Sequence, residues 1–140
     1  MNTSDKAVTI SATVNAPVEK AWNYFFNPVH IVKWNSASPD WHTPSASGDL
    51  RPGGRFTSRM EAKDGSMGFD FGGVYDEVIP NEFVSYTMDD GRKVTISFTG
   101  TENGTDILEK FDPEEMNPVE FQQAGWQAIL DSFKTYTENN

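Results

Sequence analysis

The stretch "GFDFGGVYDEVIPNEFVSYTMDDGRKVTISFTGTENGTDILEKF", residues 68–111, decides the fold. It divides into strand patterns separated by short polar turns, at 68–80, 83–88, 92–101 and 105–111. An Asp-Gly pair and an Asn-Gly pair in the last two turns reach positive φ at little steric cost, as tight hairpin turns require. Strands joined by turns this short run in opposite directions. The stretch therefore predicts an antiparallel meander.

Further strands are predicted on the N-terminal side of the meander. Residues 55–62 lead into it across an Asp-Gly turn at 64–65. Residues 6–15, "KAVTISATVN", alternate apolar and polar side chains, which is the pattern of a half-buried strand. Residues 35–54 contain three prolines and three glycines, which predicts a long loop with a short strand at 49–51.

Two short helices are predicted between the first strand and that loop. Pro17 suits the first position of a helix, and Glu19 suits the first turn, where a carboxylate favours the positive end of the helix dipole. Pro28 ends this helix, because proline disfavours helical geometry in the residue before it. Asn27 and Pro28 then serve as the cap and first residue of a second helix that runs to Lys33.

The C-terminal segment changes to a helical pattern. Asp112-Pro113 and Asn117-Pro118 each have the pattern of a helix start. From Pro118 onward a helix of roughly 20 residues is expected. Its inner face comprises Gln122, Trp126, Ile129, Leu130, Phe133 and Thr137. The predicted class is α+β, with this helix packed on the sheet.

Composition limits the classes of function. The formal net charge is −10, so nucleic acid and anionic membranes would repel the chain. The absence of cysteine excludes disulfides and thiolate chemistry. We find no signal peptide and no run of about 18 apolar residues, which predicts a cytoplasmic protein without membrane insertion. The length matches a single domain, 1–140.

Four segments carry a resemblance to a known family: "APVEKAWNYFFNPVHIVKW", "GDLRPGGRF", "DGSMGFDFGGVYDEVIPNEFVSYTMDDGRKVTISF" and "GWQAILDSFKTYTE". In this order they resemble the START/Bet v 1-like (SRPBCC) helix-grip superfamily, in the bacterial branch related to the C-terminal domain of the activator of Hsp90 ATPase. The resemblance spans about residues 8–138. It implies a curved antiparallel sheet of about six to seven strands wrapped on the C-terminal helix.

The resemblance implies a cavity rather than one activity, because the superfamily includes lipid carriers, hormone receptors, polyketide cyclases and co-chaperone domains. The eukaryotic activator has a separate N-terminal domain with an Asn-x-Asn-Asn-Trp-His-Trp motif that acts on the chaperone. This sequence lacks that motif, and "DWHT" (40–43) matches it only superficially. Stimulation of a chaperone ATPase is therefore not expected, although a chaperone partner stays open.

Ten apolar or aromatic side chains are candidates for lining the cavity. Taken one at a time, the interpretation that each simply fills the core is favoured. Taken together they favour a cavity, because a curved sheet and a straight helix do not mate completely, and rings and methionines line adaptable apolar sites. The candidates are Trp22, Phe25, Trp34, Phe56, Met60, Phe69, Phe71, Tyr75, Met88 and Trp126.

Glu109 is the main polar candidate. It shares strand parity with Ile107 and Phe111, so if these face inward, Glu109 does too. A carboxylate there needs a partner or a raised pKa, and Arg59 or Tyr75 could be that partner. The alternation of residues 55–62 predicts Phe56, Ser58 and Met60 inward, and it leaves Arg59 outward unless that strand is bulged. A bulge or strand end would instead turn Glu109 to solvent, which is the interpretation that the sequence alone favours.

His30 and His42 are the only histidines. His30 is expected at the mouth of the cavity near Trp34, where a general base or polar anchor could lie. A histidine on a short helix is more often a surface or capping residue, and His42 is expected in the loop. Two such distant histidines predict no metal site. No cofactor is expected.

The predicted function is the binding of a small, mostly apolar molecule of the lipid or aromatic class, oriented by Tyr75, Glu109 and His30. One alternative is a cyclase- or lyase-type enzyme that uses Glu109 or His30 in the same cavity, so whether the protein is an enzyme stays open. Another is a co-chaperone-like interaction module with a filled core. No nucleic-acid partner is expected, and a homodimer is left open.

Overall fold

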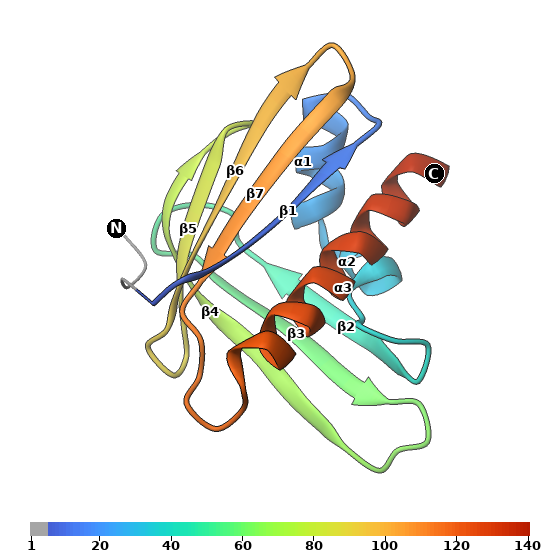
Figure 1. Cartoon of the computed structure of the whole chain (residues 1–140), viewed down its shortest axis with the longest axis vertical. Helices are drawn as coiled ribbons and strands as arrows, with labels where there is room; N and C mark the ends of the chain where they lie inside the picture. The colour runs from blue at the N-terminus through green and yellow to red at the C-terminus, as the bar shows by residue number, and fades with distance from the viewer. Residues whose placement is uncertain (1–5) are drawn as a thin grey trace.

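One antiparallel sheet curls around a long C-terminal helix in the computed structural model, which describes residues 6–140 (Figure 1). Its strands are β1 (Val8–Val14), β2 (Trp41–Gly48), β3 (Arg55–Ala62), β4 (Gly68–Ile79), β5 (Phe83–Met88), β6 (Lys93–Thr101) and β7 (Gly104–Phe111). Its helices are α1 (Val18–Phe26), α2 (Pro28–Trp34) and α3 (Val119–Asn139). The predicted α+β helix-grip fold is confirmed. The predicted domain also includes residues 1–5, which lie outside the described residues.

The strand order follows the chain except at β1. Strands β2 to β7 lie side by side in sequence order, and β1 pairs with β7 at the far edge. Gly91, in the turn after β5, has a φ of 93°, and Gly104, in the turn into β7, has a φ of 129°. Both angles suit glycine far better than other residues. The meander predicted over 68–111 is therefore confirmed, together with its turns.

Residues 35–54 differ from the predicted loop with a short strand at 49–51. The strand in this segment is β2, which pairs with β3 and ends before residue 49. Its register shifts between His42 and Ser45, on either side of Pro44. Proline has no N–H to give to a neighbouring strand, but β2 lies at the edge of the sheet, where one side needs no partner.

Helices α1 and α2 meet at Asn27. The Asn27 side chain accepts a hydrogen bond from the backbone N–H of Val29 at 3.1 Å, and Pro28 is the first residue of α2. The indole N–H of Trp34 donates to the carbonyl of Tyr24 at 2.9 Å, which ties the two helices together. The predicted break and its cap are confirmed.

Helix α3 begins at Val119, so only the second of the two predicted helix starts is right. Residues 112–118 form a loop that the buried amide of Gln122 holds in place. Its Nε2 donates to the carbonyls of Glu114 at 3.0 Å and Asn117 at 2.8 Å, and its Oε1 accepts from the N–H of Glu114 at 2.8 Å. These bonds satisfy backbone groups that a helix would otherwise pair, so the loop needs no helical turn.

Side chains also attach α3 to strand β1. Each of three α3 residues donates a hydrogen bond to a backbone carbonyl of β1, and the three carbonyls belong to alternate residues of the strand. The pairs are Gln123 with Thr9 at 3.0 Å, Gln127 with Ser11 at 3.0 Å, and Lys134 with Thr13 at 2.8 Å.

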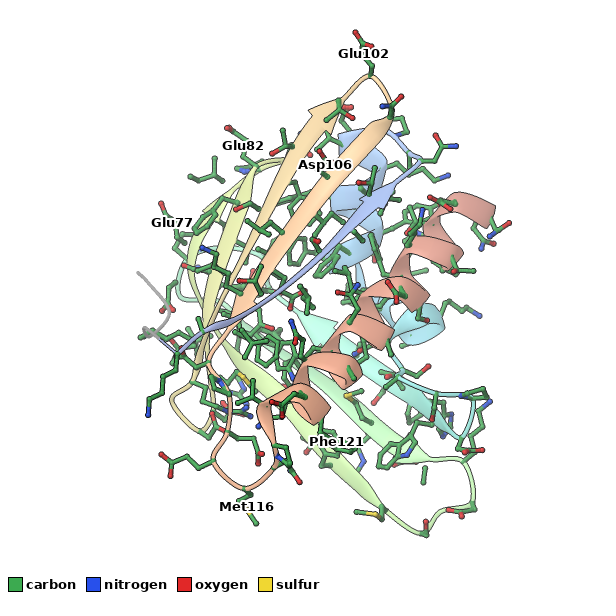
Figure 2. The ribbon with its side chains drawn as sticks, in the orientation of Figure 1. Glu77, Glu82, Glu102, Asp106, Met116 and Phe121 are labelled. Atoms are coloured by element: carbon green, nitrogen blue, oxygen red, sulfur yellow. The ribbon has the colours of Figure 1, made fainter. Side chains whose placement is uncertain are left out.

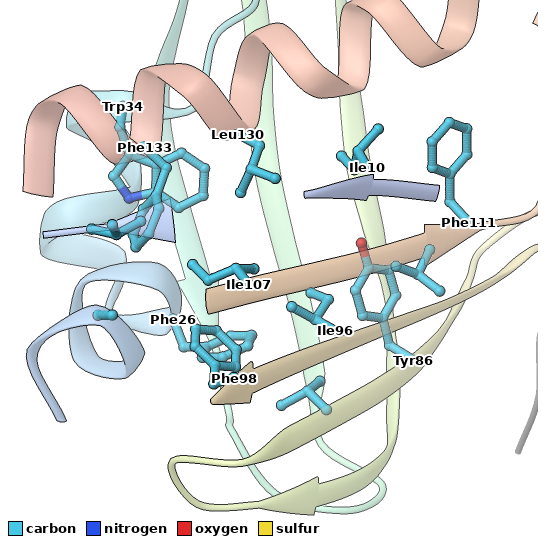
Figure 3. Close-up of a cluster of buried hydrophobic side chains, with 14 of the residues drawn as sticks. Ile10, Phe26, Trp34, Tyr86, Ile96, Phe98, Ile107, Phe111, Leu130 and Phe133 are labelled. Atoms are coloured by element: carbon cyan, nitrogen blue, oxygen red, sulfur yellow. The ribbon is translucent and has the colours of Figure 1, made fainter. Parts of the chain in front are cut away.

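The core lies between α3 and the concave face of the sheet, and it is densest near α1 and α2 (Figure 3). The Phe133 ring of α3 packs at 4.9 Å from Phe25 and 5.0 Å from Trp34. Toward the other end of α3, Trp126 stacks on Phe111 with ring centroids 4.1 Å apart. The predicted inner face of α3 is confirmed, since all six of its residues are buried or partly buried.

Candidate functional site

A cavity of about 540 Å³ lies between α3 and the concave face of the sheet. Strands β3, β4 and β5 form one wall, α3 forms the opposite wall, and α2 and the loop 112–118 add further sides. This volume falls within the roughly 300–1,000 Å³ of known small-molecule pockets.

Gly73 of β4 lies so close to β5 that a Cβ at this position would stand 2.4 Å from the carbonyl oxygen of Thr87, so a larger residue does not fit there.

The structure brings nine of the ten predicted lining residues to the cavity wall: Phe25, Trp34, Phe56, Met60, Phe69, Phe71, Tyr75, Met88 and Trp126. Trp22 is the exception and corrects the prediction. Its ring packs against Phe26 at 4.8 Å and Phe98 at 5.2 Å, in the core beside α1. Trp22 and Phe25 are both apolar at helical spacing, so the pattern alone does not separate a core residue from a wall residue.

Sequence analysis missed several wall residues, above all Trp41, Tyr86 and Phe121. Trp41 was assigned to a loop, and Phe121 lies off the inner face of α3. Tyr86 had a usable signal, because it has the same strand parity as Met88, which was predicted correctly.

Exposed aromatic side chains mark the mouth of the cavity. Phe121 of α3 and Phe69 of β4 belong to the wall, yet they are 70% and 48% exposed. Figure 2 shows Phe121 near the start of α3, with Met116 on the loop that precedes it. The Trp41 and Phe69 rings lie 6.0 Å apart. The wall of the cavity therefore reaches the surface at the start of α3 and at the start of β4.

Glu109 belongs to the cavity wall and is 6% exposed, which corrects the solvent-facing orientation that the sequence favoured. Strand β7 pairs without a bulge on both sides, with Ile10 of β1 and Ile96 of β6 opposite Glu109. The alternation of inward side chains therefore continues through Glu109 to the end of the strand. Burial raises the pKa of the Glu109 carboxyl from 4.5 to about 8.

The two partners proposed for Glu109 do not pair with it. Arg59 was predicted to face outward, and its guanidinium lies on the outer face, where it pairs with Glu61 at 2.9 Å and Asp70 at 3.5 Å. Tyr75 lies in the cavity wall. Within residues 6–140, no hydrogen bond or ion pair reaches the Glu109 carboxyl group.

Tyr75 and Tyr86 supply two phenol groups to the wall. Burial raises the pKa of both, and the nearby Glu109 carboxylate raises the pKa of Tyr86 further. Both rings pack against Phe56, at 5.0 Å and 4.8 Å, and Figure 3 shows the Tyr86 hydroxyl directed toward α3. Both hydroxyls are neutral at physiological pH, so each can donate a hydrogen bond to a guest.

Arg92 and Ser58 complete the polar part of the wall that lies on the sheet side. Among the cavity-lining residues in 6–140, Arg92 is the one with a cationic side chain. Its Nε donates a hydrogen bond to the Asp90 carboxylate at 2.8 Å. Ser58 is 5% exposed and shares the inward face of β3 with Phe56 and Met60, as predicted. The polar groups thus line a mainly apolar cavity at a few defined positions.

The structure does not bring either histidine to the cavity wall. The His30 ring stacks on Tyr24 at 3.8 Å, and its Nδ1 lies 2.8 Å from the hydroxyl of Tyr136. His30 therefore joins α1, α2 and α3 on the outside, rather than standing at the mouth. His42 lies in β2, with its Nε2 4.0 Å from Glu61.

Two further properties concern metals and membranes. No group of three or more His, Cys, Asp or Glu side chains within residues 6–140 is placed to hold a metal ion. No helix in the described part of the chain is both long and apolar enough to cross a membrane.

The fold and the sequence have relatives among solved structures. An AHSA1-like protein from Aeromonas hydrophila is 44% identical, with a TM-score of 0.90, over 95% of this chain and 92% of that chain. A protein from Cytophaga hutchinsonii is 60% identical, with a TM-score of 0.83, over 96% of this chain and 94% of that chain. A Chromobacterium violaceum protein, 23% identical over 98% of this chain and 100% of its own, shares the fold with a TM-score of 0.83.

No curated protein matches the chain. The family described as activator of Hsp90 ATPase homolog 1-like protein (AHSA1) matches residues 15–138, which is nearly the whole chain. This match agrees with the resemblance seen in the sequence and with the helix-grip fold. The chain therefore belongs to the AHSA1-like family.

Proposed function

We propose that the protein reversibly binds a small, mostly apolar molecule in the cavity between the sheet and α3. The observation that carries the proposal is the cavity of about 540 Å³, whose wall is rich in aromatic and methionine side chains and includes the exposed Phe69 and Phe121. A filled core would leave no such volume.

Binding energy would come chiefly from apolar surface removed from water, at about 25 cal/mol per Å². The phenols of Tyr75 and Tyr86 and the carboxyl of Glu109 would fix the orientation of the guest, because buried polar groups without protein partners gain most from a ligand partner. His30 is no longer a candidate anchor, because it lies outside the wall.

The test is native mass spectrometry of gently purified protein, followed by extraction with organic solvent. We expect a reproducible extra mass. Ser58→Leu should abolish it, because the added side chain fills the cavity from β3. Thr57→Leu places the same side chain on the opposite face of that strand and should keep the bound mass. An apo mass for the wild type, with no thermal shift across lipids and aromatic polyketides, would rule out this function.

A second candidate function is a cyclase- or lyase-type reaction in the same cavity, and the burial of Glu109 favours it. A carboxyl group with a pKa of about 8 can both give and take a proton near neutral pH. Incubation of an extracted ligand with the wild type should then give a product that Glu109→Gln does not form while it still binds the ligand. A ligand that stays unchanged with the wild type would exclude the reaction.

The interaction-module alternative predicted a filled core. The cavity departs from that expectation, so we do not favour this alternative.

A further inference from the structure

Glu109 differs from the other acidic side chains of the described residues. It is the one buried residue in 6–140 whose side chain is an Asp or Glu carboxyl or a Lys, Arg or His base. Several acids nearer the surface have cationic partners, as in the Arg55–Asp89 pair at 2.8 Å. The Glu109 carboxyl lies inside the cavity wall with no such partner. A buried carboxylate without a counter-charge is costly, so a bound cation would stabilise it strongly.

The groups that face the cavity around Glu109 do not supply this counter-charge. Tyr86 comes from β5 and Tyr75 from β4, and both are neutral phenols. Arg92, after β5, is already paired with Asp90. Glu114, on the loop before α3, adds a second acid to the wall.

The rest of the wall suits the same kind of guest. Aromatic faces attract organic cations, and indole rings do so best. Trp34, Trp41 and Trp126 line the cavity together with the rings of Phe56 and Phe71. The formal net charge of −10 raises the local concentration of cations and lowers that of anions.

The geometry points to an organic ammonium ion with an apolar body as the ligand, its cationic head against the Glu109 carboxylate and its body among the aromatic rings. This inference rests on the proposed function and names the ligand class. It assigns to Glu109 the role of counter-ion to this head.

Proton release provides a direct readout. The empty cavity holds Glu109 mostly protonated below about pH 8. A quaternary ammonium ion has no proton to exchange, so its binding should expel about one proton from Glu109 at a pH well below this value. Its affinity should rise about tenfold per pH unit up to about pH 8 and then level off.

The experiment is isothermal titration calorimetry with three probes of the same chain length: decyltrimethylammonium, decanol and decanoate. Titration in buffers of different ionisation enthalpy gives the number of protons released. We expect the ammonium to bind about tenfold or more tightly than decanol near pH 8, and decanoate to bind most weakly. Glu109→Gln should abolish both the preference and the proton release while keeping decanol binding. Asp106→Asn, on the outer face of the same strand, should keep both.

The outcomes separate this inference from the proposed function. Decanol or decanoate binding as tightly as the ammonium would overturn the inference and leave the proposed function standing. Ammonium binding without proton release, or with the preference intact in Glu109→Gln, would also overturn it. Failure of all three probes to bind would overturn the inference, whereas the native mass spectrum decides the proposed function separately. Retained decanol binding by Glu109→Gln shows that this variant is folded.

Discussion

A single buried carboxyl group, Glu109, makes the stability of the protein depend on pH. Its pKa is about 8 in the folded protein and 4.5 as the ordinary value, so the unfolded chain loses its proton first as the pH rises. The contribution of Glu109 to the free energy of unfolding is therefore largest below about pH 4.5. This contribution falls as the pH rises from about 4.5 to about 8. The loss is about 1.4 kcal/mol per pH unit at most.

We predict that Glu109→Gln removes this slope. Urea unfolding near pH 5 and near pH 8 should show the wild type losing stability relative to the variant by a few kcal/mol. Asp106→Asn serves as the control, because Asp106 is exposed on the same strand. An equal slope in the wild type and Glu109→Gln would mean that Glu109 does not titrate as its burial requires.

A second prediction concerns Trp22, which the structure moves from the cavity wall to the core. Trp22→Leu should lower the free energy of unfolding by about 2–4 kcal/mol, because it leaves a space between Phe26 and Phe98. It should leave the affinity for decanol unchanged, whereas Trp126→Leu should weaken decanol binding. Denaturant titration and calorimetry measure the two effects. A large loss of decanol affinity in Trp22→Leu would contradict this prediction and show that Trp22 contributes to the binding site.

These residues show how far sequence patterns predict a site. Strand alternation placed Phe56, Ser58 and Met60 inward correctly, and it also pointed to Glu109. The favoured orientation of Glu109 was nevertheless wrong. Buried acids are uncommon, which favoured a bulge or strand end that would turn Glu109 to solvent, and the sequence does not reveal that β7 has no bulge. On a helix, the spacing of Trp22 and Phe25 indicates burial but not whether a ring meets protein or empty space.

At the scale of elements, one side chain of α3 bonds to the loop 112–118 at two of its residues. The Gln122 amide makes all of its hydrogen bonds to backbone groups of Glu114 and Asn117. We predict that Gln122→Leu lowers stability by about 1–3 kcal/mol, because it leaves buried backbone groups unpaired. Amide hydrogen exchange at Glu114 should also become faster.

Gln123→Leu is the matched control for this prediction. Gln123 is the next residue of α3, it is exposed, and it makes one hydrogen bond to Thr9. Its replacement should cost about 1 kcal/mol or less and leave exchange in the loop unchanged. If Gln122→Leu left the exchange of Glu114 unchanged, another contact must hold the loop.

Elements with local signals were predicted well, and elements that depend on distant partners were not. The α2 cap at Asn27 and the glycine turns are set by neighbouring residues, so the sequence contains them. Strand β2 exists because β3 pairs with it, and its own sequence, which includes Pro44, has no strand pattern. The pattern at Asp112-Pro113 suits a helix start, but the Gln122 amide, which lies in the next helix, pairs with the backbone of that segment as a loop.

For the whole molecule, net charge should decide the response to salt. At a formal net charge of −10, repulsion among surface acids opposes the folded state, and salt screens it. We predict that stability rises when potassium chloride is added. Glu77, Glu82 and Glu102 are exposed acids with no ion pair in the described residues, and Figure 2 shows them pointing outward.

Replacing these three acids by lysine tests the prediction. Each substitution changes the formal charge by +2, so the three move it from −10 to −4. The triple variant should gain less from salt than the wild type in parallel thermal melts. An unchanged response would show that screening of net repulsion is not the cause.

The sheet is open, and its two outer strands differ in how they meet water. On β1, the side chains from α3 occupy carbonyls that another chain would otherwise bind. On β2, Pro44 and the shift of register beside it interrupt the row of backbone hydrogen bonds that a strand from another molecule would need. Neither border therefore offers a continuous row of free backbone groups, and concentrated solutions of this protein should resist strand-to-strand aggregation into fibrils although the sheet never closes into a barrel.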